Sequence, residues 1–94
     1  MTTPIKLEMP TVHLNGTHPK DLLEQAMNAH RAAHALIEAL GQAQPNGRDY
    51  YPNHNLEPAR AQHTARVEAV RAIAADMLAL AQHVQEVGAH RLEQ

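Results

Sequence analysis

Residues 45 to 55, PNGRDYYPNHN, bring together the side chains of this sequence that are best suited to hold a ligand. Tyr50 and Tyr51 are the only aromatic residues among 94, and they are adjacent. A base or another flat ring stacks on tyrosine with a free energy of ~1–3 kcal/mol. Arg48 can grip a phosphate with two parallel hydrogen bonds, and Asp49 can accept one from a ribose hydroxyl or a base amino group. The stretch therefore predicts a site for a phosphorylated ligand that contains a ring.

Neighbouring residues extend this candidate site. Asn46 and the glycine after it predict a tight turn, which would present the tyrosines. His54 and Arg60 place positive charge near the start of the following helix, where free backbone N–H groups already favour an anion. The segment around His13 is a candidate to close the site from the same subunit or from a neighbouring one. The predicted ligand-binding residues are His13, Asn46, Arg48, Asp49, Tyr50, Tyr51, His54 and Arg60.

A structural role for the same loop is the alternative. Two tyrosines at the open end of a thin helical hairpin can plug it, with the rings buried and the hydroxyls in water. Arg48 and Asp49 would then only tie the loop together. One tyrosine can also serve each role, so plug and stacking platform both stay open at this point.

Catalytic and metal sites have little support in the sequence. It contains no nucleophile elbow, no phosphate-binding glycine loop and no HExxH motif, and Asp49 with His54 is the only acid–base pair in the loop. His30 and His34 stand one helical turn apart and can chelate a metal from one face, but no third ligand is evident. We expect them to be polar positions at the edge of the helix pairing. The expectation is a protein that is not an enzyme, with no catalytic residues, no cofactor and no metal.

The composition narrows the choice of partners. Eight Lys and Arg against ten Asp and Glu leave a formal charge of −2, so there is no basic excess to bind a long nucleic acid. No apolar run approaches the ~20 residues of a membrane span, and no secretory signal is apparent. Cysteine is absent, which excludes disulfides and Cys-ligated zinc. We therefore expect a cytoplasmic protein that engages neither a membrane nor a long nucleic acid.

Helix signals dominate the rest of the chain. Residues 1–18 contain two prolines and an Asn-Gly turn, which predicts an extended arm. A helix over about 18–43 follows, then a loop over 44–55 and a second helix over about 56–87, with Gly88 as its stop. The apolar residues of the first helix alternate at spacings of four and three, as in paired helices. That stripe contains Leu22, Ala26, Ala29, Ala33, Leu36, Leu40 and Ala43, widened by Leu23, Met27 and Ile37.

These elements predict an all-α fold, an antiparallel two-helix hairpin over 19–94 with an extended N-terminal arm. Seventeen residues are alanine, which favours helix but offers little area to bury. The apolar residues of the second helix also spread beyond the arc that one partner helix covers. We therefore expect the hairpin to assemble into a helical-bundle homo-oligomer.

Two motifs carry a resemblance. VHLNGT in the arm and NGRDYYP in the loop, within a match from about Val12 to Val84, resemble a set of short phage and prophage proteins. This resemblance implies a phage origin and the cytoplasm of an infected bacterial host. In architecture alone, the predicted hairpin is similar to phage sponges that counter CBASS and Thoeris immunity. Those proteins are small, oligomeric and non-enzymatic, and they bind cyclic nucleotides or cyclic ADP-ribose isomers.

The resulting functional expectation is a phage-encoded, non-enzymatic binding protein that sequesters a nucleotide-derived immune signal. The nucleotide-like molecule would stack on the tyrosines, with Arg48 on its phosphate. The alternative is a phage structural or assembly protein, or an adaptor that docks a protein partner through its helices.

Overall fold

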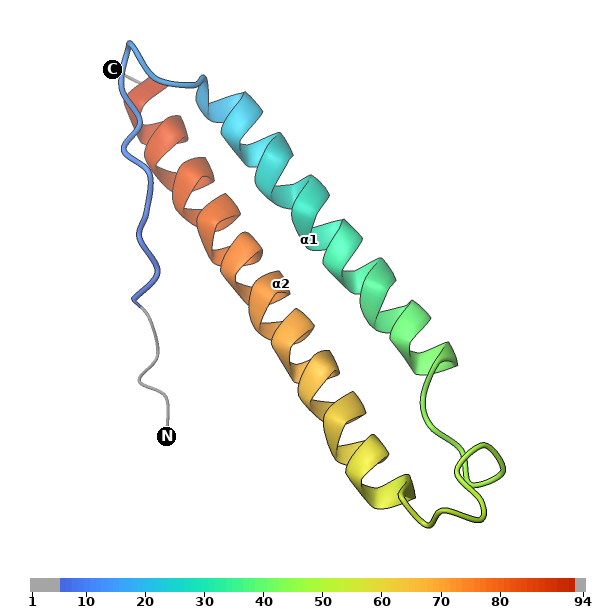
Figure 1. Ribbon diagram of the computed structural model, residues 1–94. Coiled ribbons are helices and arrows are strands. Elements are labelled where there is room, and N and C mark those ends of the chain that lie inside the picture. The colour runs from blue at the N-terminus through green and yellow to red at the C-terminus, as the bar shows by residue number, and fades with distance from the viewer. Residues whose placement is uncertain (1–5, 93–94) are drawn as a thin grey trace.

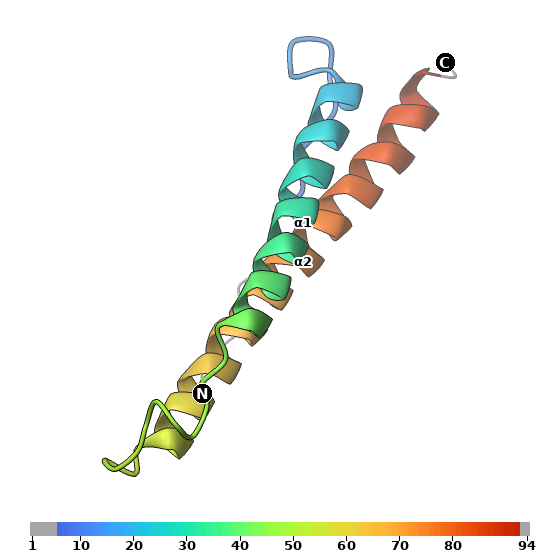
Figure 2. The ribbon, with the colours of Figure 1, turned by 90° about the vertical axis from the view of Figure 1, so that its right-hand side faces the viewer.

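The computed structural model describes residues 6–92 of the chain, and the side chains of residues 6–88. Two helices, α1 (Pro19–Gln42) and α2 (Leu56–Leu92), pack side by side as an antiparallel hairpin (Figures 1 and 2). The described residues contain no strand, so the prediction of an all-α hairpin is confirmed. The molecule is a rod of 66 × 28 × 17 Å, with a radius of gyration of 18.7 Å. A compact domain of this length would have about 12 Å, so much of the chain stays at the surface.

Local signals account for the ends of α1. The Nδ1 atom of His18 accepts a hydrogen bond from the backbone N–H of Lys20 at 3.1 Å, which caps the first turn. Pro19 takes the first helical position, and Asp21 places an acidic group at the positive end of the helix dipole. At the other end, the N–H of Ala43 bonds to the carbonyl of Leu40 at 3.0 Å.

The end of α2 differs from the prediction. Gly88 does not stop the helix, which continues to Leu92. A Cβ atom on Gly88 would lie 2.7 Å from Cβ of Pro19, so the glycine is a contact point between the two helices. Its missing side chain lets the start of α1 approach α2 closely. Gly88 therefore serves packing, and α2 outruns α1.

The core follows the seam, the line along which α1 and α2 touch. Its buried members are small, and they recur along each helix at the spacing of a paired-helix contact. Little apolar area is removed from water, because alanine contributes only its methyl group. The buried apolar side chains of the described residues are Val12, Ala26, Ala33, Ala74, Ala81 and Val84.

On α1 the seam is rotated from the stripe that the sequence predicts. Ala29 and Leu36, both predicted seam residues, are exposed. His30 and Ile37, one position further along, are half-buried and keep the same alternation of four and three. The rotation brings the His30 ring to the backbone of α2, where it hydrogen bonds to the carbonyl of Ala74, and it leaves the larger Leu36 at the surface.

The N-terminal arm, residues 6–18 of the described chain, packs against the hairpin. It runs beside α2 and then turns at residues 14–16 into the start of α1 (Figure 1). Val12 is buried, and Nε2 of His83 donates a hydrogen bond to the carbonyl oxygen of Pro10 at 3.0 Å. The arm thus adds a third layer over one half of the hairpin. Within the described residues, neither helix contains an apolar stretch long enough to cross a membrane.

Candidate functional site

The loop between the helices is held by a small hydrogen-bond network at Asn46. Its Nδ2 donates to Oδ2 of Asp49 at 2.8 Å, and its Oδ1 accepts from the backbone N–H of Asp49 at 3.1 Å. The backbone N–H of Tyr50 bonds to the carbonyl of Gly47 at 3.3 Å. These bonds form an Asx-type turn that presents the residues between them. Both Asn46 and Asp49 therefore have a positioning role.

The two tyrosines differ in their exposure to solvent. Tyr50 is half-buried, whereas Tyr51 is 75% exposed. The ring of Tyr51 lies edge-on to the ring of His54, with centroids 6.2 Å apart, and His54 has a φ of 56°. Such a left-handed conformation is uncommon for a residue other than glycine, and it turns the loop back toward α2. Partial burial of Tyr50 is consistent with a plug, whereas most of Tyr51 remains in contact with water.

Arg48 joins Tyr51 at the surface. Both residues line a shallow depression together with Asn46 and Gly47. The Arg48 side chain is exposed, so its guanidinium can bind an anion beside the ring. The loop therefore brings one aromatic ring, one cationic fork and one amide together within a few residues.

Arg60 lies apart from this depression. Its Nη1 is 3.2 Å from Oε1 of Glu57, an exposed ion pair one turn apart on α2. Arg60 also lines a different hollow, with Gln44, Pro45 and His63. The structure does not bring it to Tyr51 as the sequence-based site assumed.

His13 is at the other end of the molecule. It belongs to the turn before α1, whose Gly16 N–H bonds to the His13 carbonyl at 3.1 Å, whereas the loop follows α1 (Figure 1). The 24 residues of α1 span roughly 36 Å. His13 therefore cannot close the Tyr51 site of its own chain, and only closure from a neighbouring subunit remains as a proposal.

His30 and His34 of α1 and His83 of α2 have structural partners. The Nδ1–H of His30 donates to the carbonyl of Ala74 at 2.9 Å, which fixes the tautomer of that ring. The ring of His34 lies edge-on to it, with centroids 4.6 Å apart. Within the described part of the chain, no three His, Cys, Asp or Glu residues are grouped to hold a metal ion. His83, which sequence reasoning assigned to no group, is the residue that holds the arm.

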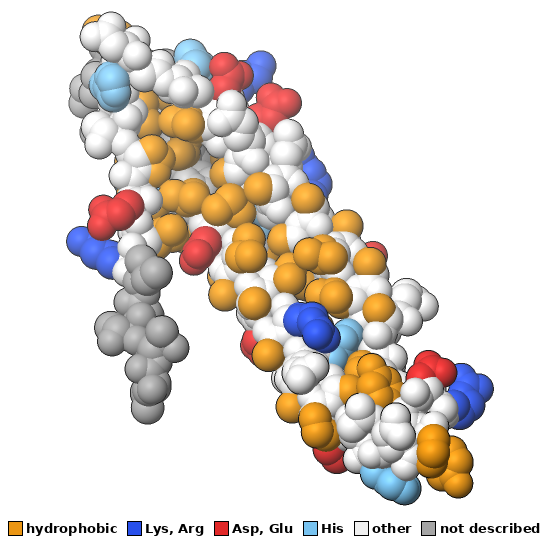
Figure 3. All heavy atoms as spheres, viewed as in Figure 1, with side chains coloured by type: hydrophobic (Ala, Val, Ile, Leu, Met, Phe, Trp, Pro, Cys, Tyr) orange, Lys and Arg blue, Asp and Glu red, His pale blue; other side chains and the backbone are white. Residues whose placement is uncertain are grey.

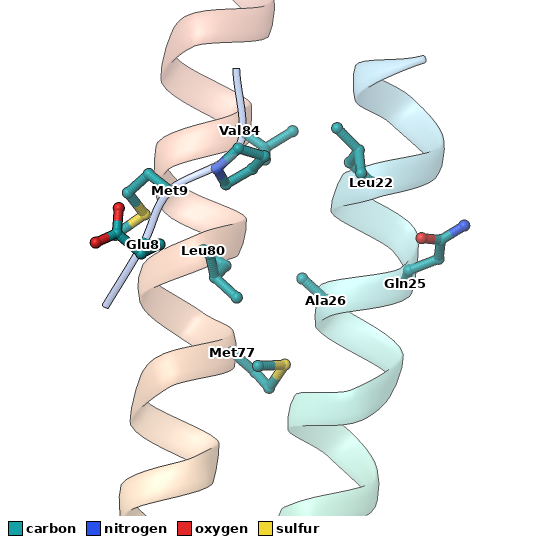
Figure 4. A pocket seen from close by; sticks show the side chains of 9 residues that line it. Glu8, Met9, Leu22, Gln25, Ala26, Met77, Leu80 and Val84 are labelled. Carbon is teal, nitrogen blue, oxygen red and sulfur yellow. The ribbon is translucent and has the colours of Figure 1, made fainter. Parts of the chain in front are cut away.

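A third hollow was not predicted from the sequence. It lies between the arm and both helices and has a volume of about 540 Å³. In Figure 4, Leu22 and Ala26 of α1 face Leu80 and Met77 of α2, while Met9 lies on the arm. Periodicity could place these residues near the seam, but only the docked arm turns that stretch into a groove. Its lining is mainly apolar.

Comparison of the chain with protein-family models, with curated proteins and with solved structures found no match.

Proposed function

We propose that this chain is a non-enzymatic binding protein whose loop, at Tyr51 and Arg48, holds a flat anionic ligand of the nucleotide class. Sequestration of a nucleotide-derived immune signal by a phage-encoded protein is the role we propose for this binding. The observation that carries the proposal is the 75% exposure of the Tyr51 ring beside an exposed guanidinium. An exposed tyrosine adds no buried area to the core, although the chain has only two aromatic residues.

The chemistry of the ligand follows from the groups that surround the depression. The tyrosine ring stacks on a base or a similar flat ring, and the guanidinium fork binds phosphate oxygens. Asn46 is tied to Asp49, which preorganises the loop and reduces the entropy lost on binding. The motifs NGRDYYP and VHLNGT, which resemble those of short phage proteins, supply the proposed biological setting.

Calorimetric titration tests the proposal, with cyclic dinucleotides, cyclic trinucleotides and cyclic ADP-ribose isomers as the probes. Tyr51→Ala should weaken binding about 5- to 150-fold, the equivalent of ~1–3 kcal/mol of stacking. Tyr51→Phe keeps the ring and should bind nearly as well as the wild type. Arg48→Lys keeps the charge but loses the fork, and should also weaken binding.

The controls separate a binding defect from a folding defect. Tyr51→Ala should leave the free energy of unfolding almost unchanged, because the side chain is exposed. Tyr50→Ala should lower it, because that ring is half-buried. The absence of heat with all of these nucleotides, or an unchanged affinity of Tyr51→Ala, would refute the nucleotide site.

A second candidate function is a structural or assembly protein, or an adaptor that docks a protein through its helices. Leu36 and Ile73, 48% and 52% exposed, favour this function, because a bound protein would remove these large apolar side chains from water. A protein partner retained from infected cells, together with a negative nucleotide screen, would support it.

A further inference from the structure

One broad face of the hairpin carries apolar side chains beyond the groove under the arm. Leu36 follows Gln25 by eleven residues, which is three helical turns, and Ile73 precedes Leu80 by seven, which is two. Gln25 and Leu80 both line the groove beneath the arm, so Leu36 and Ile73 belong to the same face. Figure 3 shows apolar side chains gathered in a band along it. We call this surface the arm face.

The exposed pair lies at the middle of the arm face. Leu36 comes seventeen residues after Pro19, where α1 begins at the arm end of the rod. Ile73 comes seventeen residues after Leu56, where α2 begins at the loop end. At 1.5 Å per residue, each lies ~26 Å from its own end. Because the helices are antiparallel and Pro19 packs on Gly88, the pair is centred between the two ends.

The arm makes the two halves of this face different in height. Its contacts through Pro10 with His83 place residues 8–12 over the half near the arm end. The half toward the loop is the lower one in the part of the chain that the structure describes. If two copies packed face to face with their arms at the same end, the two arm-covered halves would meet and the two uncovered halves would be held apart. In an antiparallel arrangement, the arm-covered half of each copy packs against the uncovered half of its partner.

We propose that the arm face is the interface with a second copy of this chain, packed antiparallel about a two-fold axis that lies in the interface and runs across both helices at the level of Leu36 and Ile73. In this arrangement α1 crosses the α1 of its partner, and Leu36 packs against its own counterpart, as in an isologous contact. The broad face measures 66 × 28 Å, roughly 1,800 Å², and a standard interface takes about 800 Å² per partner. Less than half of the face would therefore supply the area of a standard interface. The partner supplies the apolar area that an alanine seam cannot supply.

The same symmetry brings the arm turn of one copy to the loop of the other. Leu14, at the tip of that turn, is 94% exposed, more than any other large apolar side chain that the structure describes. It comes to lie over the partner's loop, near Tyr51. His13 of the same turn then lies near the ligand site of the partner, although it is far from the ligand site of its own chain. This last consequence rests on the proposed function, whereas the interface itself does not.

The chain contains no cysteine, so in a cross-linking experiment only the introduced thiols can react. Under mild oxidation, Leu36→Cys should form a disulfide-linked dimer, since the two copies of this residue face each other across the axis. Glu38→Cys, on the opposite side of α1, is the matched control and should stay monomeric on a denaturing gel. An equimolar mixture of Leu14→Cys and Tyr51→Cys chains should give a mixed dimer with a short bismaleimide.

Sedimentation of the wild-type chain provides a measurement free of any substitution, and it should give the mass of a dimer or of a multiple of it. A monomer at micromolar concentration would overturn the proposal. So would Leu14→Cys chains that cross-link only to each other, since that pattern means a parallel pair. Capture of a different protein by Leu36→Cys in place of its own copy would also overturn it. Nucleotide titration of the same samples reports separately on the loop, so either proposal can fail alone.

Discussion

Replacement of Gly88 by alanine gives the most direct test of how the two helices meet. The added Cβ would lie 2.7 Å from Cβ and 3.3 Å from Cγ of Pro19. Carbon atoms in ordinary contact are about 3.5–4.0 Å apart, so the start of α1 has to move by roughly 1 Å. The proline ring cannot rotate away, since it is fixed to the backbone.

Two effects oppose each other in this variant. Overpacking costs ~1–3 kcal/mol, whereas alanine is favoured over glycine inside a helix by up to ~1 kcal/mol. We expect a net loss of about 1 kcal/mol for Gly88→Ala. Gly41 in α1 is the matched control, because a Cβ there would meet nothing within 4 Å. Gly41→Ala should therefore gain up to ~1 kcal/mol from helix propensity alone.

Urea unfolding followed by far-UV circular dichroism, at one protein concentration, measures both variants. The two free energies of unfolding should differ by ~1–3 kcal/mol, with Gly88→Ala the less stable. Equal stabilisation of both variants would refute the reasoning, because it would mean that Pro19 does not rest on Gly88 and that the upper end of the hairpin is packed differently.

Two side-chain hydrogen bonds lead to further predictions. His83→Leu keeps the bulk of the side chain but loses the bond to the Pro10 carbonyl, about 1 kcal/mol, so trypsin should cleave the arm about fivefold faster. An unchanged cleavage rate would show that this bond does not hold the arm. His30→Leu loses the bond to the Ala74 carbonyl and should lower the free energy of unfolding by about 1 kcal/mol in urea. The exposed His34→Leu serves as its control, and an equal loss there would argue against the interhelical bond.

Secondary structure was largely predictable from the sequence because its signals are local. Pro19 with a capping residue before it starts α1, and Pro45 follows its end. Asn46 followed by Gly47 marks a turn, and the apolar alternation of four and three marks a pair of helices. Each of these signals depends on residues within a few positions of one another. The alanine content likewise predicted a core with little buried apolar area.

The sequence indicated which residues of the loop could bind a ligand, but it did not indicate how their side chains are arranged in space. Adjacent tyrosines share most of their neighbours in sequence, and no periodic pattern in the loop indicates that Tyr50 is half-buried and Tyr51 exposed. Arg60 looked close to the loop in sequence, yet its guanidinium pairs with Glu57. His13 was assigned to the same site, although the length of α1 separates them. Distance along a chain becomes distance in space only after the helices are laid out.

Sequence alone decided that this protein is a helical hairpin with an aromatic, cationic loop and little apolar bulk. Tertiary packing decided which side of each helix meets the other. The rotation of α1 that brings His30 to the backbone of α2 leaves Leu36 at the surface, and Gly88 lies inside α2 at the close approach of Pro19. These outcomes depend on contacts between residues tens of positions apart. The energy of such contacts is not contained in either segment, because it exists only once the two helices and the arm are packed together.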